Sequence, residues 1–470
     1  MSLFSNLTVG SQALLSFQKG IDVVNKNMTN IYTKGYKREI PTYTNFPING
    51  VSFDQAKRVY DERLLNRFID TNQKNSFNKT LSSNLGSIEQ IFNDINGTGF
   101  ASALDNFFYS MNDIITSPDN LAARDSFLYA SETLIGRIRS SYDELSNIKT
   151  TNQQSIQDNI NQLNLKLKAL AKVNRAIKTN LDNDSILNSN LNERDRLLEE
   201  ISSLIDTKVR FNSDKSVDLF SSKGHTLLLF DKPFEVSLKN EPNTITINDP
   251  DTGDTLTYNI NSTQLLINGV NLTQEFQNGI IGAKLATEVA LDEMIYNLNS
   301  FTFKFANILN ATHTSGYDID GNLGDNLFVN EDTLSPLDID ASNIKLNFLD
   351  PRKVAASNTN TGIESNNKNM INMFYLKDEK FTILQNQTLN EFYNSSLVAK
   401  IGTKKSYIDN FYSDSKALLE SISSKIDELS GVNMDEELIR LTQLQRSYEA
   451  SARIITVTDE LLQTVMGLVD

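Results

Sequence analysis

Residues 3–31, LFSNLTVGSQALLSFQKGIDVVNKNMTNI, carry the pattern that decides the fold. Apolar side chains recur there in alternating steps of four and three, and only Gly10 breaks the series. Such a seven-residue repeat places a narrow apolar seam along one side of a helix. We therefore expect a coiled-coil helix that ends near Gly35. Its seam is formed by Leu3, Leu7, Leu14, Phe17, Ile21, Val24, Met28 and Ile31.

The other end of the chain has a matching pattern, in which five apolar residues stand seven positions apart. Leu438, Ala452 and Met466 flank this row, whereas Gln445 and Asp459 interrupt the flanking row with polar side chains. The spacing predicts a second coiled-coil helix that runs to the end of the chain. Its seam is formed by Leu441, Tyr448, Ile455, Leu462 and Val469.

Two interpretations of these seams are open. Burying the apolar side chains of the first seam yields ~2 kcal/mol each, but ordering the backbone costs ~1–2 kcal/mol for every residue. Each end is therefore expected to be mobile alone and ordered only against a partner helix. The partner is either the other end of the same chain, in an ordinary antiparallel pair, or another subunit. Seams at both extreme termini favour an assembly interface.

Composition excludes several classes of function. The chain has 470 residues and a formal net charge of −15, so it is a poor partner for nucleic acid or anionic lipid. It has no cysteine, and His225 and His313 are its only histidines. We therefore expect no metal site, no cofactor and no catalytic residues. No apolar run approaches 18 residues and no basic leader precedes an apolar run, so neither membrane insertion nor a cleaved signal peptide is expected.

Changes of periodicity divide the interior. Heptad-like spacing from Ile156 to Leu181, with Asn174 as its polar break, continues a helical region, and period-two alternation begins near Lys208. Helical spacing returns near Leu285, residues 316–394 are weakly periodic, and a long helix covers about 400–429. The predicted fold is mainly α with an inserted all-β domain. Its divisions are 1–45 (helix and linker), 46–207 (helical), 208–275 (β domain), 276–430 (helical with an irregular segment) and 431–470 (helix).

Helix boundary signals support this division. Asn433 can cap the last helix, whose first turn holds three acidic residues that suit the helix dipole. The run Ser117–Asn120 reads as the stop of one helix and the start of the next.

The acidic clusters favour turns over chemistry. The stretch Tyr317–Asp325 has Leu323 where a calcium loop needs glycine, so a turn is expected there. The adjacent acids Glu199 and Glu200 point in different directions on a helix and cannot form an acid–base pair. No phosphate-binding loop or nucleophile motif is present. The residues predict a scaffold and not an enzyme.

Several segments resemble proteins of one bacterial structure. Asn27–Arg38 resembles the N-terminal signature of flagellar axial proteins, although Lys34 stands where proline is common. Gly431–Glu437 and Gln445–Ala450 look like the matching C-terminal end. Interior stretches are similar to the hook-associated, hook-filament junction family and keep its order along the chain. They are Arg58–Leu65, Ile88–Asn93, the run from Ala103 to Arg124, Leu191–Leu198 and Gly316–Asp318.

The resemblance implies a structural subunit of the flagellum. In that family the terminal helices pair as an inner coiled coil, a helical domain surrounds it, and a β domain points outward. The implied partners are further copies in a homo-oligomeric ring, the hook protein and the second hook-filament junction protein. Type III export would carry the chain from the cytoplasm to the extracellular flagellum. The implied contacts of a flagellar export chaperone are Leu438, Leu441, Tyr448, Ile455 and Leu462.

Alternatives remain at this stage. A hook or distal-rod protein shares the terminal signatures, and the interior segments argue against it. A secreted adhesin on an axial-protein scaffold would place its specificity in residues 208–275.

Overall fold

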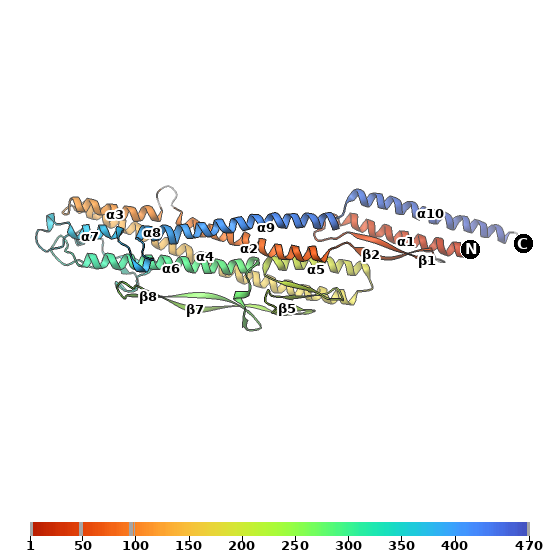
Figure 1. Ribbon diagram of the computed structural model, residues 1–470, viewed down its shortest axis with the longest axis horizontal. Coiled ribbons are helices and arrows are strands. Elements are labelled where there is room, and N and C mark those ends of the chain that lie inside the picture. Colours follow the sequence, from red (N-terminus) through yellow and green to blue (C-terminus); the bar gives the residue numbers. More distant parts are fainter. Residues whose placement is uncertain (1–2, 47–49, 94–96, 98, 468–470) are drawn as a thin grey trace.

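The computed structural model describes residues 3–46, 50–93, 97 and 99–467. The molecule is elongated, its helices run along the long axis, and the two chain ends lie at the same tip (Figure 1). The described α-helices are α1 (Leu3–Thr29), α2 (Glu62–Phe92), α3 (Phe100–Thr116), α4 (Leu121–Thr179), α5 (Asp184–Leu204), α6 (Gly279–Thr314), α7 (Lys368–Tyr375), α8 (Leu389–Phe392), α9 (Lys400–Ser430) and α10 (Met434–Met466).

Aromatic side chains fill the core of the helical body at the tip opposite the chain ends. Phe305 of α6 is fully buried, and its ring centroid lies 5.2 Å from that of Phe107 in α3. The Phe328 ring is also 5.2 Å away, and Phe301 stacks on Phe305 at 5.9 Å. This density of large apolar contacts holds α3, α4 and α6 together with the irregular segment that follows them.

The long helix α4 has the seam that its spacing predicts. Ile156, Ile160, Leu163, Leu167, Leu170 and Ile177 are all buried, whereas Leu181 lies beyond the helix end and is exposed. The predicted polar break Asn174 is buried as well. It donates to the carbonyls of Val217 and Phe230, at 2.7 and 2.6 Å, and accepts from the Val217 amide at 3.0 Å. The break in the seam is therefore the attachment point of the neighbouring sheet.

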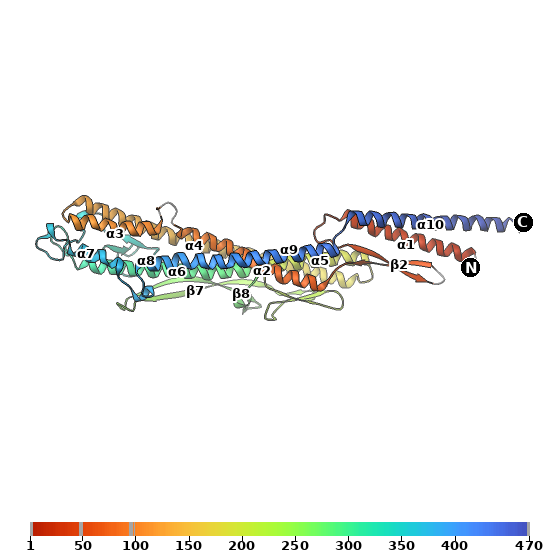
Figure 2. The same ribbon diagram turned by 45° about the horizontal axis from the view of Figure 1, so that its top comes forward.

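The strands of the inserted segment fall within residues 208–275 and lie along one flank of the helices (Figures 1 and 2). They do not form a compact β domain with a core of its own, because Val217, Leu227 and Leu265 are buried in one cluster with leucines of α4 and α5. A four-stranded sheet has the order β3-β4-β5-β6, and a second sheet has the order β7-β8-β9. Their bounds are β3 (Lys208–Phe211), β4 (Val217–Phe220), β5 (Thr226–Leu229), β6 (Lys232–Pro233), β7 (Val236–Asn248), β8 (Thr255–Ile267) and β9 (Val270–Asn271).

The β7–β8 hairpin is fastened at its tip. Lys304 of α6 is 2% exposed, and its Nζ lies 2.8 Å from Asp249 and 3.2 Å from Asp251, in the turn of the hairpin. The Lys304 ammonium also lies over the Phe381 ring. The ion pair thus joins the turn of the hairpin to α6.

Residues 316–394 consist of turns and short elements, as their weak periodicity indicates. The strands β10 (Phe328–Asn330) and β11 (Ile344–Leu346) pair antiparallel. Between β11 and α9 lie α7, α8 and five further short helical segments. These segments are η3 (Pro351–Lys353), η4 (Ile363–Ser365), η5 (Leu376–Asp378), η6 (Thr382–Leu384) and η7 (Tyr393–Ala399). The Asp318 carboxylate accepts the amides of Asp320 and Asn322, both at 2.9 Å, so this segment is a turn.

The predicted helix boundaries are confirmed at two places. The Asn433 side chain accepts from the amides of Asp435 and Glu436, and the Asn120 side chain caps α4. Gly35, predicted to end the first helix, follows α1 in a turn with φ +83°.

The sequence interpretation missed one element. Residues 39–58 were expected to be linker and helix, but they form an antiparallel hairpin of β1 (Glu39–Phe46) and β2 (Gly50–Arg58) against α1. The dipeptide Asn49–Gly50 between Tyr43 and Phe53 is the signal that predicts such a hairpin.

Candidate self-assembly interface

The two ends of the chain form one antiparallel helix pair, which extends beyond the helical body (Figures 1 and 2). The antiparallel arrangement within one chain, one of the two interpretations left open by the sequence, is therefore the observed one. The two terminal helices supply the partner that neither has alone.

The predicted residues of α1 line this pair to different degrees. Val24 is fully buried, and the other predicted seam residues of the helix are partly buried. Ile31 is partly buried too, but it lies beyond the end of α1. The partly buried set within the helix is Leu3, Leu7, Leu14, Phe17, Ile21 and Met28.

One of the two rows expected on α10 differs from the prediction. Leu441, Tyr448, Ile455 and Leu462 form a partly buried row, and Val469 lies outside the described residues. The second row that faces α1 is Glu437, Leu444, Ser451 and Thr458, all buried. The flanking row expected from Leu438 to Met466 instead turns toward solvent: Leu438 and Met466 are exposed. The row that starts at Glu437 and the row that starts at Leu438 both repeat every seven residues, as the row from Leu441 does. Heptad spacing alone therefore does not show which of the two packs against α1.

Small residues explain which row faces inward. A Cβ atom on Gly10 would lie 2.9 Å from Cγ1 of Ile455. One on Gly20 would lie 2.1 Å from the Tyr43 hydroxyl of β1 and 3.3 Å from both Cδ atoms of Leu444. The α1 backbone therefore approaches α10 closely where glycine faces it and where α10 presents Ser451. Gly10, which interrupts the apolar pattern in the sequence, is a packing position and not a defect.

A polar cluster closes the base of the pair. The buried Asn27 side chain donates from Nδ2 to the Glu39 carbonyl at 2.8 Å and to Oε2 of Glu437 at 2.9 Å. Its Oδ1 accepts from the Glu39 amide at 2.9 Å and from the Tyr36 hydroxyl at 2.8 Å. Asn27 thus joins the end of α1, the start of β1 and the first turn of α10. We call Asn27, Tyr36, Glu39 and Glu437 the basal cluster.

Charge and burial define the chemistry of the basal cluster. Burial raises the pKa of the Tyr36 hydroxyl well above its ordinary value, and the carboxylates of Glu39 and Glu437 raise it further. Tyr36 is therefore a neutral hydrogen-bond donor. Lys26 pairs with Glu39 at 2.6 Å, and Arg440 lies 3.5 Å from Glu437. Spacing along the chain does not bring these side chains together, because Asn27 and Glu437 lie 410 positions apart in the sequence.

The β1–β2 hairpin also packs against α1. The Ser16 hydroxyl donates to the Val51 carbonyl at 3.1 Å and accepts from the Phe53 amide at 3.0 Å. The rings of Phe17, Tyr43 and Phe53 pack in series, with centroids about 6 Å apart. α1 thus contacts both the hairpin and α10.

A buried ion triad joins this hairpin to the body. Arg58 at the end of β2 and Arg194 of α5 both pair with Asp195, and all three are buried. Burial alone would raise the pKa of Asp195, but the two guanidinium groups hold it below its ordinary value. Asp195 is therefore ionised and links the terminal elements to α5.

Apolar side chains remain exposed beside the seam. Ile454, Val457, Leu461 and Val465 form a stripe along α10, and each is about half exposed, at 48–53%. Phe4 and Leu15 of α1 are exposed at 71% and 54%. We call these six residues the exposed terminal face. Contiguous exposed apolar patches are typical of protein–protein contact sites.

Two kinds of feature are absent from the part of the chain that the structure describes. No group of three or more His, Asp or Glu side chains in the described ranges could hold a metal ion. Among the same residues, no helix is long and apolar enough to cross a membrane.

Comparisons with known proteins point to one family. Residues 85–328 match the family model of the flagellar hook-associated protein FlgK helical domain, and residues 424–468 match the model of the flagellar basal body rod FlgEFG protein C-terminal. Flagellar hook-associated protein 1 of Bacillus subtilis is 22% identical over 99% of this chain and 98% of its own length. The protein of the same name from Escherichia coli is 19% identical over 99% of this chain and 100% of its own.

Other matches agree in name or in fold. Flagellar hook-associated protein 1 of Salmonella typhimurium is 22% identical over 66% of this chain and 57% of its own length. The solved structure of the flagellar hook junction protein FlgK from Burkholderia pseudomallei has a TM-score of 0.62 at 13% identity. That match covers 77% of this chain and 99% of the other. It shows that the two share a fold.

Proposed function

Since the chain belongs to the FlgK family of flagellar hook-associated proteins, we propose that its paired terminal helices and exposed terminal face build the contacts by which it joins hook to filament. Its role is structural, at the hook-filament junction, and it is not an enzyme. The observation that carries the proposal is the antiparallel α1–α10 pair, which extends from the body and leaves an apolar stripe uncovered.

The proposed assembly is a homo-oligomeric ring. Within each copy the seam residues hold α1 to α10, and between copies the exposed terminal face is buried. About half of each side chain in the α10 stripe is exposed in the single chain. Burying that area on several copies supplies a driving force that no single copy has. The hook protein on one side and the second hook-filament junction protein on the other are the proposed axial neighbours.

Export and localisation follow from the same proposal. The chain would leave the cytoplasm through the flagellar type III apparatus and act in the extracellular flagellum. A flagellar export chaperone is proposed to bind Leu438, Leu441, Tyr448, Ile455 and Leu462. Since four of these are partly buried against α1, the chaperone would bind α10 in place of α1. It should therefore bind Tyr448→Asp weakly in a pull-down of the purified chain.

Two substitutions separate the seam from the exposed terminal face. Leu14→Asp places a charge in the seam, so it should open the helix pair, block assembly and increase protease cleavage within residues 1–40 and 435–470. Val457→Asp lies on the exposed stripe, so it should block assembly while the pair stays resistant to protease. The exposed polar position Ser11→Asp is the matched control. Assembly is followed by sedimentation and body folding by thermal melting.

The cellular test is the phenotype of cells that lack the chain. They should build hooks without filaments and release filament subunits into the medium. The wild-type gene and the Ser11→Asp variant should restore filaments, whereas Leu14→Asp and Val457→Asp should not. Full motility of either Asp variant would contradict the proposal.

A further inference from the structure

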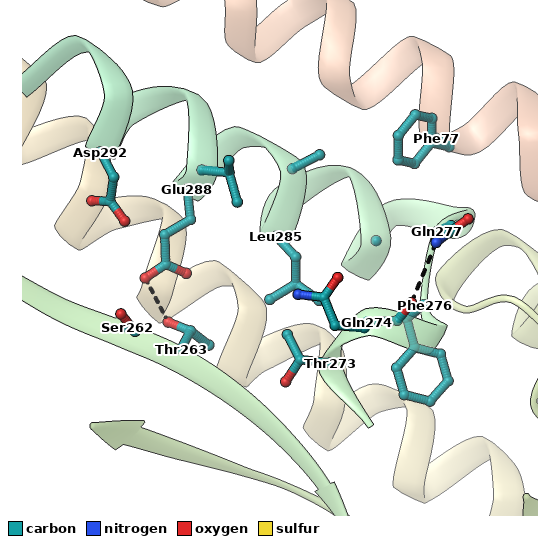
Figure 3. A pocket seen from close by; sticks show the side chains of 13 residues that line it. Phe77, Ser262, Thr263, Thr273, Gln274, Phe276, Gln277, Leu285, Glu288 and Asp292 are labelled. Carbon is teal, nitrogen blue, oxygen red and sulfur yellow. Dashed lines mark hydrogen bonds between the residues drawn. The ribbon is translucent and has the colours of Figure 1, made fainter. Parts of the chain in front are cut away.

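Lys284 of α6 is a half-buried cation without a counterion, in a chain whose 59 acidic residues outnumber its 44 basic ones. Glu288, one turn further along α6, has the spacing of a helical ion-pair partner. Its Oε1 instead accepts from Oγ1 of Thr263 at 2.8 Å and from Nε2 of Gln153 at 2.7 Å. Figure 3 shows Glu288 beside Thr263, in a cleft that other residues of α6 line. Burial lowers the pKa of Lys284, and no carboxylate in the described part of the chain is close enough to offset that effect.

Lys284 lines a separate cavity between α2, α4 and α6. The cavity has a volume of about 340 Å³, which suits a molecule of monosaccharide size. Hydroxyl and amide side chains form most of its lining, Ile148 adds one apolar group, and no carboxylate is among the described lining residues. Asn147, Thr151 and Ser155 stand four residues apart, so they follow one another along the α4 wall.

These three side chains of α4 and the ammonium of Lys284 are open to a ligand. Within the described ranges, none of the four forms a side-chain hydrogen bond or an ion pair. None of them is among the enclosed polar atoms that lack a partner, so a molecule in the cavity can reach each of them.

Hydrogen bonds between the helices fix the walls of the cavity. The buried Asn152 of α4 donates from Nδ2 to the Lys284 carbonyl at 2.8 Å, which joins α4 to α6. The buried Thr287 of α6 accepts at Oγ1 from Nδ2 of Asn84 at 2.9 Å, which joins α6 to α2. The open groups are therefore presented by a preformed frame, so little ordering is needed when a ligand binds.

We propose that this cavity binds a hydroxylated carboxylate of the size of one sugar acid. Its carboxylate would pair with the ammonium of Lys284, and its hydroxyl groups would hydrogen-bond to Asn147, Thr151 and Ser155. A single negative charge on the ligand balances the single cation of the lining, and the hydroxyl groups match a wall that has little apolar surface. Neither the junction role nor the terminal pair uses this cavity.

The test titrates the purified chain with D-glucuronate and follows binding by ligand-observed NMR. D-glucose lacks the carboxylate and acetate lacks the hydroxyl groups, so each should bind at least about tenfold more weakly than glucuronate. Lys284→Met removes the ammonium and keeps most of the side-chain length, so it should weaken glucuronate binding by about tenfold or more. Thr151→Trp, at an exposed position, should fill the cavity mouth and abolish binding with Lys284 in place. Thermal melting checks that both variants fold.

The matched control is Lys168→Met, which removes one positive charge from an exposed position of α4 outside the cavity. It should leave glucuronate binding within about twofold of the wild type. Equal binding of glucuronate by wild type and Lys284→Met would overturn the proposal, as would equal binding of glucuronate and either comparison ligand, or no binding by the wild type. A carboxylate of a second copy in the cavity would also overturn it. In that case Lys284→Met would weaken self-association, and glucuronate would not bind.

Discussion

The helical body and the terminal pair are built from different kinds of contact. Phe107, Phe301 and Phe305 are fully enclosed in the body and pack against one another. In the terminal pair most seam residues are only partly buried, and α10 presents Ser451 and Thr458 to α1. Enclosed apolar contacts thus hold the body together, whereas the pair depends on close backbone approach and a polar base. We therefore expect the ends to open and re-form while the body stays folded.

The largest effect is expected from a cavity in the body. Phe305→Ala should lower the free energy of unfolding by about 3–5 kcal/mol, because it removes a ring enclosed by three other rings. Denaturant unfolding followed by circular dichroism measures the change. The control is Phe4→Ala at the exposed tip, with an expected change below about 0.5 kcal/mol. Comparable losses in both variants would remove the distinction between body and tip.

Acid should weaken the body through His313. Burial lowers the pKa of His313 to about 4, and its neutral ring accepts the Ala355 amide at Nε2 and contacts the Asp325 carbonyl through Nδ1. The folded chain binds fewer protons than the unfolded chain between pH 6.5 and about 4. This stability is therefore complete above pH 6.5 and is lost as the pH falls toward 4, by about 3 kcal/mol in all.

The measurement compares the unfolding midpoint at pH 7.0 and 4.5 with that of His313→Gln, which should lose most of the pH dependence in this range. His225→Gln, at a half-exposed position, is the matched control and should keep it. The chain has only these two histidines, so ring NMR signals assign the titration directly. A His313 ring that titrates near pH 6.5 in the folded chain would contradict the prediction.

The basal cluster should respond to the loss of one side chain. Asn27→Ala removes the donor to Oε2 of the buried Glu437 carboxylate and both side-chain partners of the Glu39 backbone groups, so it should cost about 2–3 kcal/mol. Because the cluster lies at the base of the pair, the cost should appear as faster amide hydrogen exchange in α1 and α10, with little change in α6. Asn25→Ala, exposed on the same helix, should leave exchange unchanged. Unaltered exchange in Asn27→Ala would show that the pair does not depend on the cluster.

The sequence predicted the parts of the fold that periodicity specifies. The seams of α1 and α4 follow from the regular recurrence of apolar residues, and Asn433 and Asn120 follow from local capping chemistry. Periodicity does not predict contacts between residues that are distant in the sequence. Asn27 and Glu437 lie 410 positions apart, and Leu444 packs inward at Gly20, where Tyr43 of the hairpin also meets α1. The β1–β2 hairpin was missed although Asn49–Gly50 signals a turn.

The smallest change in stability is expected at two helical glycines, Gly10 and Gly136, whose substitutions should act in opposite directions. Gly10→Leu forces a side chain into Ile455, so it should cost about 1–3 kcal/mol and push α10 away from α1. A Cβ atom added to Gly136 in α4 would meet no other atom within 4 Å. Gly136→Ala should therefore stabilise the body by about 0.5–1 kcal/mol through helix propensity. Limited proteolysis of the ends reports the first change, and thermal melting reports the second. If Gly10→Leu left the ends as resistant to protease as in the wild type, close approach of the α1 and α10 backbones would not hold the pair. The partly buried apolar row of α10 would then be what holds it.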